Sequence, residues 1–200
     1  MNGANADMAV GCGYKYLNGG PGAPAFAFVA ARHHEGLDQP LTGWMGHAAP
    51  FAFEEDYRPG TGMQRMLAGT PPVIAMAALA SGLATWDGID MPRAAAKSQA
   101  LGDLFLDLAA ARCPEFEVAC PRDNRGAQAS LAHPDAYAIM QALISRRVVG
   151  DFRAPDVLRF GFPALYTRFV DVWDAVETLA DIMATGEWQA PEHSQRRAVT

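Results

Sequence analysis

The sequence predicts an α/β protein whose C-terminal part packs helices on a small, mostly antiparallel sheet. Three observations support this fold class. Two apolar runs of strand length flank a Gly/Pro-rich loop near the N-terminus. A Thr-Pro-Pro sequence at 70–72 marks the start of a helix. From residue 90 onward, the pattern indicates a helix, two strands, a helix, two strands and a helix.

The boundaries of these elements follow from hydrophobic spacing and from Gly, Pro and Asp-Gly signals. Thr70 suits the N-cap of the first helix and Pro71 its first position. Leu101, Phe105 and Leu108 recur at helical spacing in the second. In chain order, we expect strands at 7–10 and 24–31, helices at 71–85 and 92–112, strands at 116–119 and 127–132, a helix at 134–147, strands at 148–153 and 157–160, and a helix at 166–184.

Two segments lack a regular pattern. Residues 36–62 are rich in Gly, Pro and aromatic residues and show little helical periodicity. A loop of this length in a compact domain is usually functional or part of an interface. The tail from Gly186 carries Pro, Gln and Arg, and we expect it to be frayed.

The composition excludes several classes of protein. Half of the 200 residues are hydrophobic, so a sizeable core is expected. The net charge is −6 with the two signs mixed along the chain, and no basic stripe suggests nucleic acid as a partner. No apolar run is long enough to span a bilayer, and the N-terminus lacks the pattern of a secretory signal. We therefore expect neither a nucleic-acid nor a membrane partner.

The cysteines and histidines indicate no metal site. Cys12, Cys113 and Cys120 are odd in number and lie in no metal-binding spacing, which favours a reduced, cytoplasmic protein. His33-His34-Glu35 follows a predicted strand and precedes a Gly/Pro loop. A surface turn is the expected structure there.

Lys15 is the residue that most suggests chemistry. It is one of only two lysines, the other being Lys97, and it lies between Tyr14 and Tyr16 in a glycine-rich loop. Aromatic neighbours can shield an amine from water, and desolvation favours the neutral form, which is the nucleophile in imine chemistry. A solvated loop lysine is the alternative interpretation of Tyr-Lys-Tyr alone. Tyr16 is expected to have a packing role.

The run 7–26 resembles the cofactor-lysine loop of the kynureninase family, whose members are fold-type-I pyridoxal-phosphate enzymes related to aspartate aminotransferase. The resemblance continues through 58–62, 68–71 and 158–166, up to about Trp188. It implies the C-terminal portion of the large cofactor domain, followed by a small α+β domain. The implied boundaries are 1–70 for the end of the large domain, 71–89 for a connecting helix, 90–188 for the small domain and 189–200 for a flexible tail.

The resemblance also implies roles for particular side chains. Lys15 would bind the cofactor covalently and later move the substrate α-proton. Tyr14, Trp44 and Thr70 would contact the cofactor phosphate, Thr70 with the help of a helix N-terminus. Tyr14 would also have a catalytic role, in which its hydroxyl assists proton transfer. Arg159 would hold the substrate α-carboxylate, because its planar fork makes two parallel hydrogen bonds. Purely structural roles remain open for these residues: a core tyrosine, an anchoring tryptophan, a plain N-cap and a surface ion pair.

The implied reaction is hydrolysis of L-kynurenine, or its 3-hydroxy form, to anthranilate, or 3-hydroxyanthranilate, and L-alanine in tryptophan catabolism. A homodimer is implied as well. The phosphate loop and the aspartate that pairs with the pyridinium nitrogen precede the lysine in this family. We therefore expect the chain alone to be a fragment with little activity. A noncatalytic partner of a full-length homologue and another aminotransferase class V-like enzyme, such as a cysteine desulfurase, are the alternatives.

Overall fold

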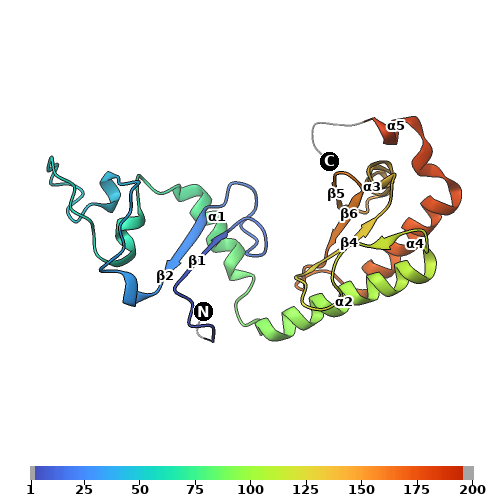
Figure 1. Cartoon of the computed structure of the whole chain (residues 1–200), viewed down its shortest axis with the longest axis horizontal. Coiled ribbons are helices and arrows are strands. Elements are labelled where there is room, and N and C mark those ends of the chain that lie inside the picture. Colours follow the sequence, from blue (N-terminus) through green and yellow to red (C-terminus); the bar gives the residue numbers. More distant parts are fainter. Residues whose placement is uncertain (1–2, 196–200) are drawn as a thin grey trace. The chain divides into compact units, whose positions relative to one another are not determined.

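The computed structural model describes residues 3–195, which divide into two compact units at Gly88/Ile89 (Figure 1). The N-terminal unit contains a two-stranded antiparallel sheet and one longer helix. In chain order, its elements are β1 (Met8–Cys12), β2 (Ala25–Val29), 3-10 helices at Ala31–His33, Trp44–Gly46 and Gly62–Met66, and α1 (Val73–Ala84). The two strands lie where apolar runs predicted them.

The C-terminal unit is a four-stranded sheet with helices (Figure 1). The strand order is β3-β4-β6-β5, and every neighbouring pair is antiparallel. This confirms the antiparallel sheet expected from the order of elements. In chain order, the unit contains α2 (Met91–Arg112), β3 (Glu117–Val118), β4 (Gln128–Ala132), α3 (Ala136–Ser145), β5 (Asp151–Arg153), β6 (Val157–Gly161), α4 (Phe169–Thr185), a 3-10 helix (Glu187–Gln189) and α5 (Pro191–Ser194).

The hydrophobic core of the C-terminal unit forms where α2, α3 and α4 bring their apolar side chains to the sheet. The ring of Phe105 on α2 lies 4.7 Å from that of Phe160 and 5.4 Å from that of Phe162, measured between centroids. Burial of such side chains is the main stabilising contribution to a fold of this kind. The largest fully buried side chains are those of Leu101, Phe105, Leu106, Cys113, Leu131, Ile139, Met140, Leu143, Leu158, Val176, Leu179 and Ile182.

The first helix begins later than predicted. The helix α1 starts at Val73 with Pro72 before it, and no side chain caps its N-terminus. The prediction that Thr70 is the N-cap was therefore wrong. A residue that precedes proline is disfavoured in the helical conformation, and Pro71 precedes Pro72. Pro71 is therefore kept out of the helix, which begins after Pro72.

The C-terminal tail is more ordered than expected over its described part. The helix α5 packs against α3. Trp188 packs against the core, and its ring meets that of His133 edge-on at 6.0 Å. The sequence pattern missed these contacts because they join residues that are distant along the chain. Residues 196–200 lie outside the described residues.

Cys113 is buried at the end of α2, and burial raises the pKa of its thiol to about 11. Because the thiolate is the reactive form, we expect iodoacetamide at about pH 8 to alkylate Cys113 roughly 100-fold more slowly than Cys12 or Cys120 in the native chain. Mass spectrometry of timed digests measures the three rates. Equal rates before denaturation would contradict the buried position, whereas equal rates in denaturant are expected.

Candidate functional site

The loop that carries Lys15 is closed by its own backbone. The Gly13 N–H donates to the Pro24 carbonyl and the Gly19 N–H to the Gly13 carbonyl, each at 3.0 Å. The Asn18 N–H donates to the Lys15 carbonyl at 3.0 Å, which forms a turn. The first two bonds hold the neck of the loop, and the third places Lys15 at its tip. The geometry therefore presents this side chain on an ordered turn.

The same loop rests on the C-terminal end of α1. The Asn18 side-chain amide donates to the Thr85 hydroxyl at 3.0 Å, and that hydroxyl donates to the Gly82 carbonyl at 2.6 Å. A Cβ atom on Gly82 would lie 2.5 Å from the Asn18 carbonyl oxygen. Only glycine allows this approach, so the loop is positioned by the helix that follows much later in the chain.

Replacing Gly82 by alanine is expected to loosen the lysine loop. Alanine favours a helix by about 1 kcal/mol relative to glycine, but overpacking against fixed backbone costs roughly 1–3 kcal/mol. The clash therefore prevails, because the atoms met are backbone atoms of Asn18 and Gly19. Hydrogen exchange of the Gly19 amide should accelerate in this variant. It should stay unchanged in Ser81→Ala, a control at the neighbouring exposed position of α1.

Lys15 itself is exposed and forms no hydrogen bond or ion pair with the described residues 3–195. Its Nζ atom lies 5.2 Å from the ring centroid of Tyr14. Tyr16 instead stacks on Trp86, with centroids 5.0 Å apart and planes at 23°. The structure thus gives Tyr16 the expected packing role, but it does not place the amine between two aromatic rings. The shielding expected from the sequence is not found, because stacking on Trp86 takes Tyr16 to α1.

Trp44 lies in the irregular segment between β2 and α1, on a short 3-10 helix. Its side chain is exposed and meets Phe51 edge-on at 5.6 Å. Gly43 packs directly on the Ala68 backbone, and the Met45 N–H donates to the Ala68 carbonyl at 3.4 Å. These contacts hold the segment of Trp44 against Ala68, which is two residues before Thr70. Thr70 is exposed.

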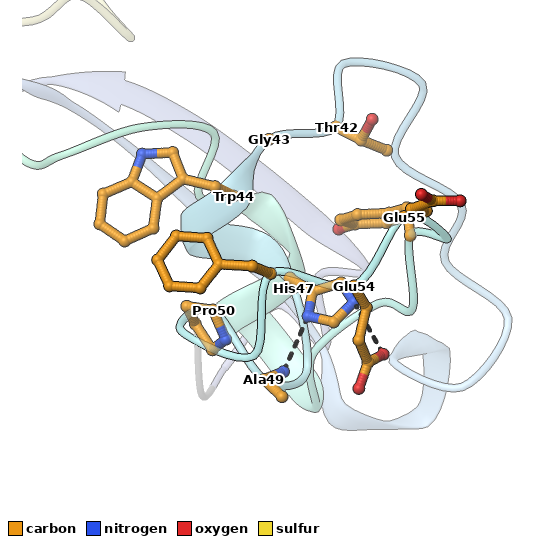
Figure 2. Close-up of a pocket in the computed structure, with 10 residues that line it drawn as sticks. Thr42, Gly43, Trp44, His47, Ala49, Pro50, Glu54 and Glu55 are labelled. Atoms are coloured by element: carbon orange, nitrogen blue, oxygen red, sulfur yellow. Dashed lines mark hydrogen bonds and ion pairs between the residues drawn. The ribbon is translucent and has the colours of Figure 1, made fainter.

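A pocket of about 470 Å³ adjoins Trp44 (Figure 2). His47 is buried beneath it; its Nδ1 accepts from the Ala49 N–H at 2.9 Å, so Nε2 carries the proton and donates to the Asp56 carbonyl at 3.2 Å. The sequence analysis did not single out His47. Both of its ring nitrogens bond to backbone groups of the loop, so its role is to hold the loop in place. The pocket is lined by Thr42, Gly43, Trp44, His47, Ala49, Pro50, Phe53, Glu54, Glu55 and Tyr57.

Arg159 belongs to the C-terminal unit, on β6. Its Nε and Nη2 atoms donate to the two carboxylate oxygens of Asp151 at 2.7 and 2.6 Å. Hydrogen bonding from Arg159 holds the pKa of the Asp151 carboxyl below its ordinary value. Sequence reasoning missed Asp151. The only signal was the spacing of two charged residues across a predicted hairpin.

Residues 3–195 contain neither a cluster of metal-binding side chains nor a helix that could span a membrane. Among residues 3–195, no group of three or more His, Cys, Asp or Glu side chains could hold a metal ion. In the same range, no helix combines the length and the apolar character needed to cross a bilayer.

Known kynureninase sequences are similar to this chain. Residues 94–179 match the family described as the kynureninase C-terminal domain. The chain is 53% identical over 204 residues to a kynureninase of Burkholderia mallei, covering 100% of this chain and 49% of that protein. It is 45% identical over 201 residues to a kynureninase of Pseudomonas fluorescens, covering 98% of this chain and 48% of that protein. The chain corresponds in sequence to the C-terminal half of kynureninase. It spans about half the length of the curated relatives it matches.

Solved structures show the fold to which this chain is similar. A cysteine desulfurase of Escherichia coli matches with a TM-score of 0.72 and 17% identity, over 92% of this chain and 48% of that chain. An apo cysteine desulfurase of Thermococcus onnurineus NA1 matches with a TM-score of 0.70 and 17% identity, over 90% and 46%. These neighbours confirm the predicted α/β fold class, that of fold-type-I pyridoxal-phosphate enzymes. At this identity they show the fold alone.

Proposed function

We propose that the chain provides the C-terminal half of a pyridoxal-phosphate-dependent kynureninase, which hydrolyses L-kynurenine or 3-hydroxykynurenine to the corresponding anthranilate and L-alanine. The observation that carries the proposal is the amine of Lys15, exposed and unpaired at the tip of a hydrogen-bonded loop. It occurs in a chain that is 53% identical, over 100% of its own length, to 49% of a kynureninase of Burkholderia mallei.

The free donors of the N-terminal unit fit pyridoxal phosphate. Within the described residues, the indole N–H of Trp44 and the hydroxyls of Tyr14 and Thr70 donate to no protein acceptor. N–H and O–H donors without a protein acceptor suit the oxygens of a phosphate. When bound, the cofactor supplies an electron sink for carbanion chemistry. No tightly held structural partner would have to be displaced from any of these three groups.

The protein side chains then have distinct tasks. We propose that Lys15 attaches the cofactor and transfers the substrate α-proton, since an unpaired amine can do both. Tyr14, Trp44 and Thr70 would hold the phosphate. Arg159 would orient the amino-acid substrate through its carboxylate. We assign these roles by the match to the family together with the contacts above.

Assembly and compartment are further parts of the proposal. The segment 36–62 contains three large apolar residues that are mostly exposed. The exposed fractions are 76% for Leu41, 75% for Phe51 and 88% for Phe53. Apolar side chains this exposed favour an interface, and we propose a homodimer. We place the protein in the cytoplasm, because Cys12, Cys113 and Cys120 are all free. Light scattering at several concentrations tests the dimer.

The test of the activity uses the chain alone and the chain joined to the N-terminal half of the Pseudomonas fluorescens kynureninase. With pyridoxal phosphate and L-kynurenine, anthranilate fluorescence should appear with the joined protein and stay near background with the chain alone. Arg159→Gln in the joined protein should raise the KM for L-kynurenine. Cysteine offered as a substrate should give no sulfide. A joined protein that folds and binds the cofactor but releases sulfide and no anthranilate would favour the desulfurase alternative.

A further inference from the structure

The hairpin β5–β6 brings two opposite charges together across a sheet. Asp151 on β5 and Arg159 on β6 are directly opposite in the antiparallel register. Their neighbours Phe152, Leu158 and Phe160 are buried in the core. Because side chains alternate along a strand, Asp151 and Arg159 lie on the face of the sheet away from those core side chains.

The contact uses only one edge of the Arg159 guanidinium. Nε and Nη2 are engaged by the two oxygens of Asp151. Within the described residues, Nη1 has no hydrogen-bond partner. It is not one of the buried side-chain atoms without a partner. The side chain keeps 29% of its surface accessible. One edge of the fork is therefore fixed, and the other is open to a ligand.

We propose that Asp151 is a positioning residue, which locks the Nε–Nη2 edge of Arg159 so that Nη1 and the remaining Nη2 proton face a ligand carboxylate. The inference rests on the proposed function for the identity of that carboxylate, the α-carboxylate of an amino acid. Arginine presents five N–H donors in a fixed plane, so one guanidinium can bind two carboxylates along two edges.

Two effects of Asp151 oppose each other. Its charge partly neutralises Arg159, which weakens attraction for a second anion. Its two hydrogen bonds remove the rotational freedom that Arg159 would otherwise lose on binding. The pair is partly exposed, with Asp151 at 41% accessible, and solvent screens the charge effect. Orientation does not depend on screening, so the positioning effect prevails.

The test follows the Arg159 Nε–Hε signal by NMR in the 200-residue chain labelled with ¹⁵N-arginine. Loss of the signal in Arg159→Gln assigns it. In the wild type the signal should show that the Nε–Hε group has restricted motion and exchanges slowly with water. In Asp151→Ala the group should become mobile. Asp151→Glu, which keeps a carboxylate, should restore part of the restriction. Equal mobility in the wild type and Asp151→Ala would overturn the proposal.

L-kynurenine is then titrated into the same samples. The wild-type Arg159 signal should shift in a saturable way, and Asp151→Ala should weaken the affinity about tenfold. Unchanged or tighter binding in Asp151→Ala would overturn the positioning role, and no saturable shift in the wild type would overturn the carboxylate role. Neither readout requires hydrolysis, so failure here is distinguishable from failure of the proposed activity.

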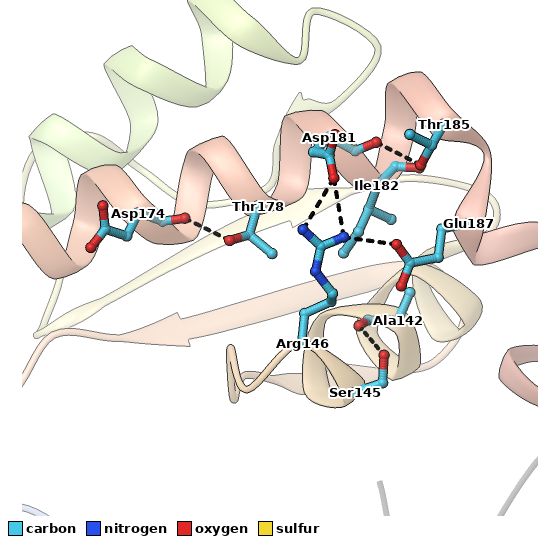
Figure 3. A network of polar contacts seen from close by, with 9 residues as sticks. All are labelled: Ala142, Ser145, Arg146, Asp174, Thr178, Asp181, Ile182, Thr185 and Glu187. Atoms are coloured by element: carbon cyan, nitrogen blue, oxygen red, sulfur yellow. Dashed lines mark hydrogen bonds and ion pairs between the residues drawn. The ribbon is translucent and has the colours of Figure 1, made fainter.

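A matched control comes from another arginine–aspartate contact of the same unit. Asp181 accepts from Nη1 and Nη2 of Arg146 at 3.1 Å, and Glu187 accepts from Nη1 at 2.8 Å (Figure 3). Asp181→Ala removes a carboxylate of similar exposure from α4. It should alter the Arg146 signal and leave both the Arg159 signal and the L-kynurenine affinity unchanged. Thermal melting of both variants checks that each remains folded.

Discussion

Replacing Lys15 by alanine is expected to abolish covalent attachment of pyridoxal phosphate to the chain. The amine of Lys15 is exposed and forms no hydrogen bond or ion pair within the described residues, so it is available to a cofactor aldehyde. Borohydride reduction of the chain incubated with the cofactor, followed by peptide mass spectrometry, should locate the pyridoxyl group at Lys15. The variant should lose this modified peptide entirely.

Lys97 provides the control, because it is the only other lysine. Its Nζ atom donates to the Ala164 carbonyl at 2.7 Å, which ties α2 to the segment after β6. Lys97→Ala should therefore keep the label at Lys15. Equal labelling of both lysines in the wild type would show nonspecific reaction and would contradict the assignment of Lys15.

Phe105→Ala is expected to destabilise the C-terminal unit by about 3–5 kcal/mol. Only 1% of the Phe105 surface is accessible, and its ring packs on Phe160 and Phe162. Removing the ring forfeits its burial and leaves a cavity between α2 and the sheet. Because domains of this size are stable by only about 5–15 kcal/mol, such a loss is a large fraction of the total. Urea denaturation followed by circular dichroism measures the difference.

Phe169→Ala separates this effect from the loss of any phenylalanine. Phe169 begins α4 and keeps 49% of its surface accessible. A substitution at such an exposed site should change the free energy of unfolding by less than about 1 kcal/mol. Equal destabilisation by Phe105→Ala and Phe169→Ala would show that the core is not where the structure places it.

The sequence predicted those features that depend on local spacing. Leu101 and Phe105, four positions apart, revealed the buried side of α2 before any contact was known. The pattern of two short strands separated by a turn predicted a strand at 157–160, and β6 lies there. The apolar runs at 7–10 and 24–31 predicted strands on both sides of the Lys15 loop, and β1 and β2 lie there.

Other features depend on contacts between residues far apart in the chain. The start of α1 was misplaced because two consecutive prolines outweighed the capping preference of Thr70. Because Tyr16 follows Lys15 in the sequence, its ring was expected to shield the amine, but it stacks on Trp86 instead. Asp151 is meaningful only once the hairpin register sets it opposite Arg159. No spacing along a single strand contains that information.

The glycines around the lysine loop limit how this stretch can evolve. A Cβ atom on Gly13 would lie 2.6 Å from the Pro24 carbonyl oxygen, and one on Gly19 would lie 2.7 Å from the Gly13 carbonyl oxygen. Gly82 meets the same limit from the helix side. Any side chain at one of these three glycines would therefore force the backbone of the loop that carries Lys15 to shift.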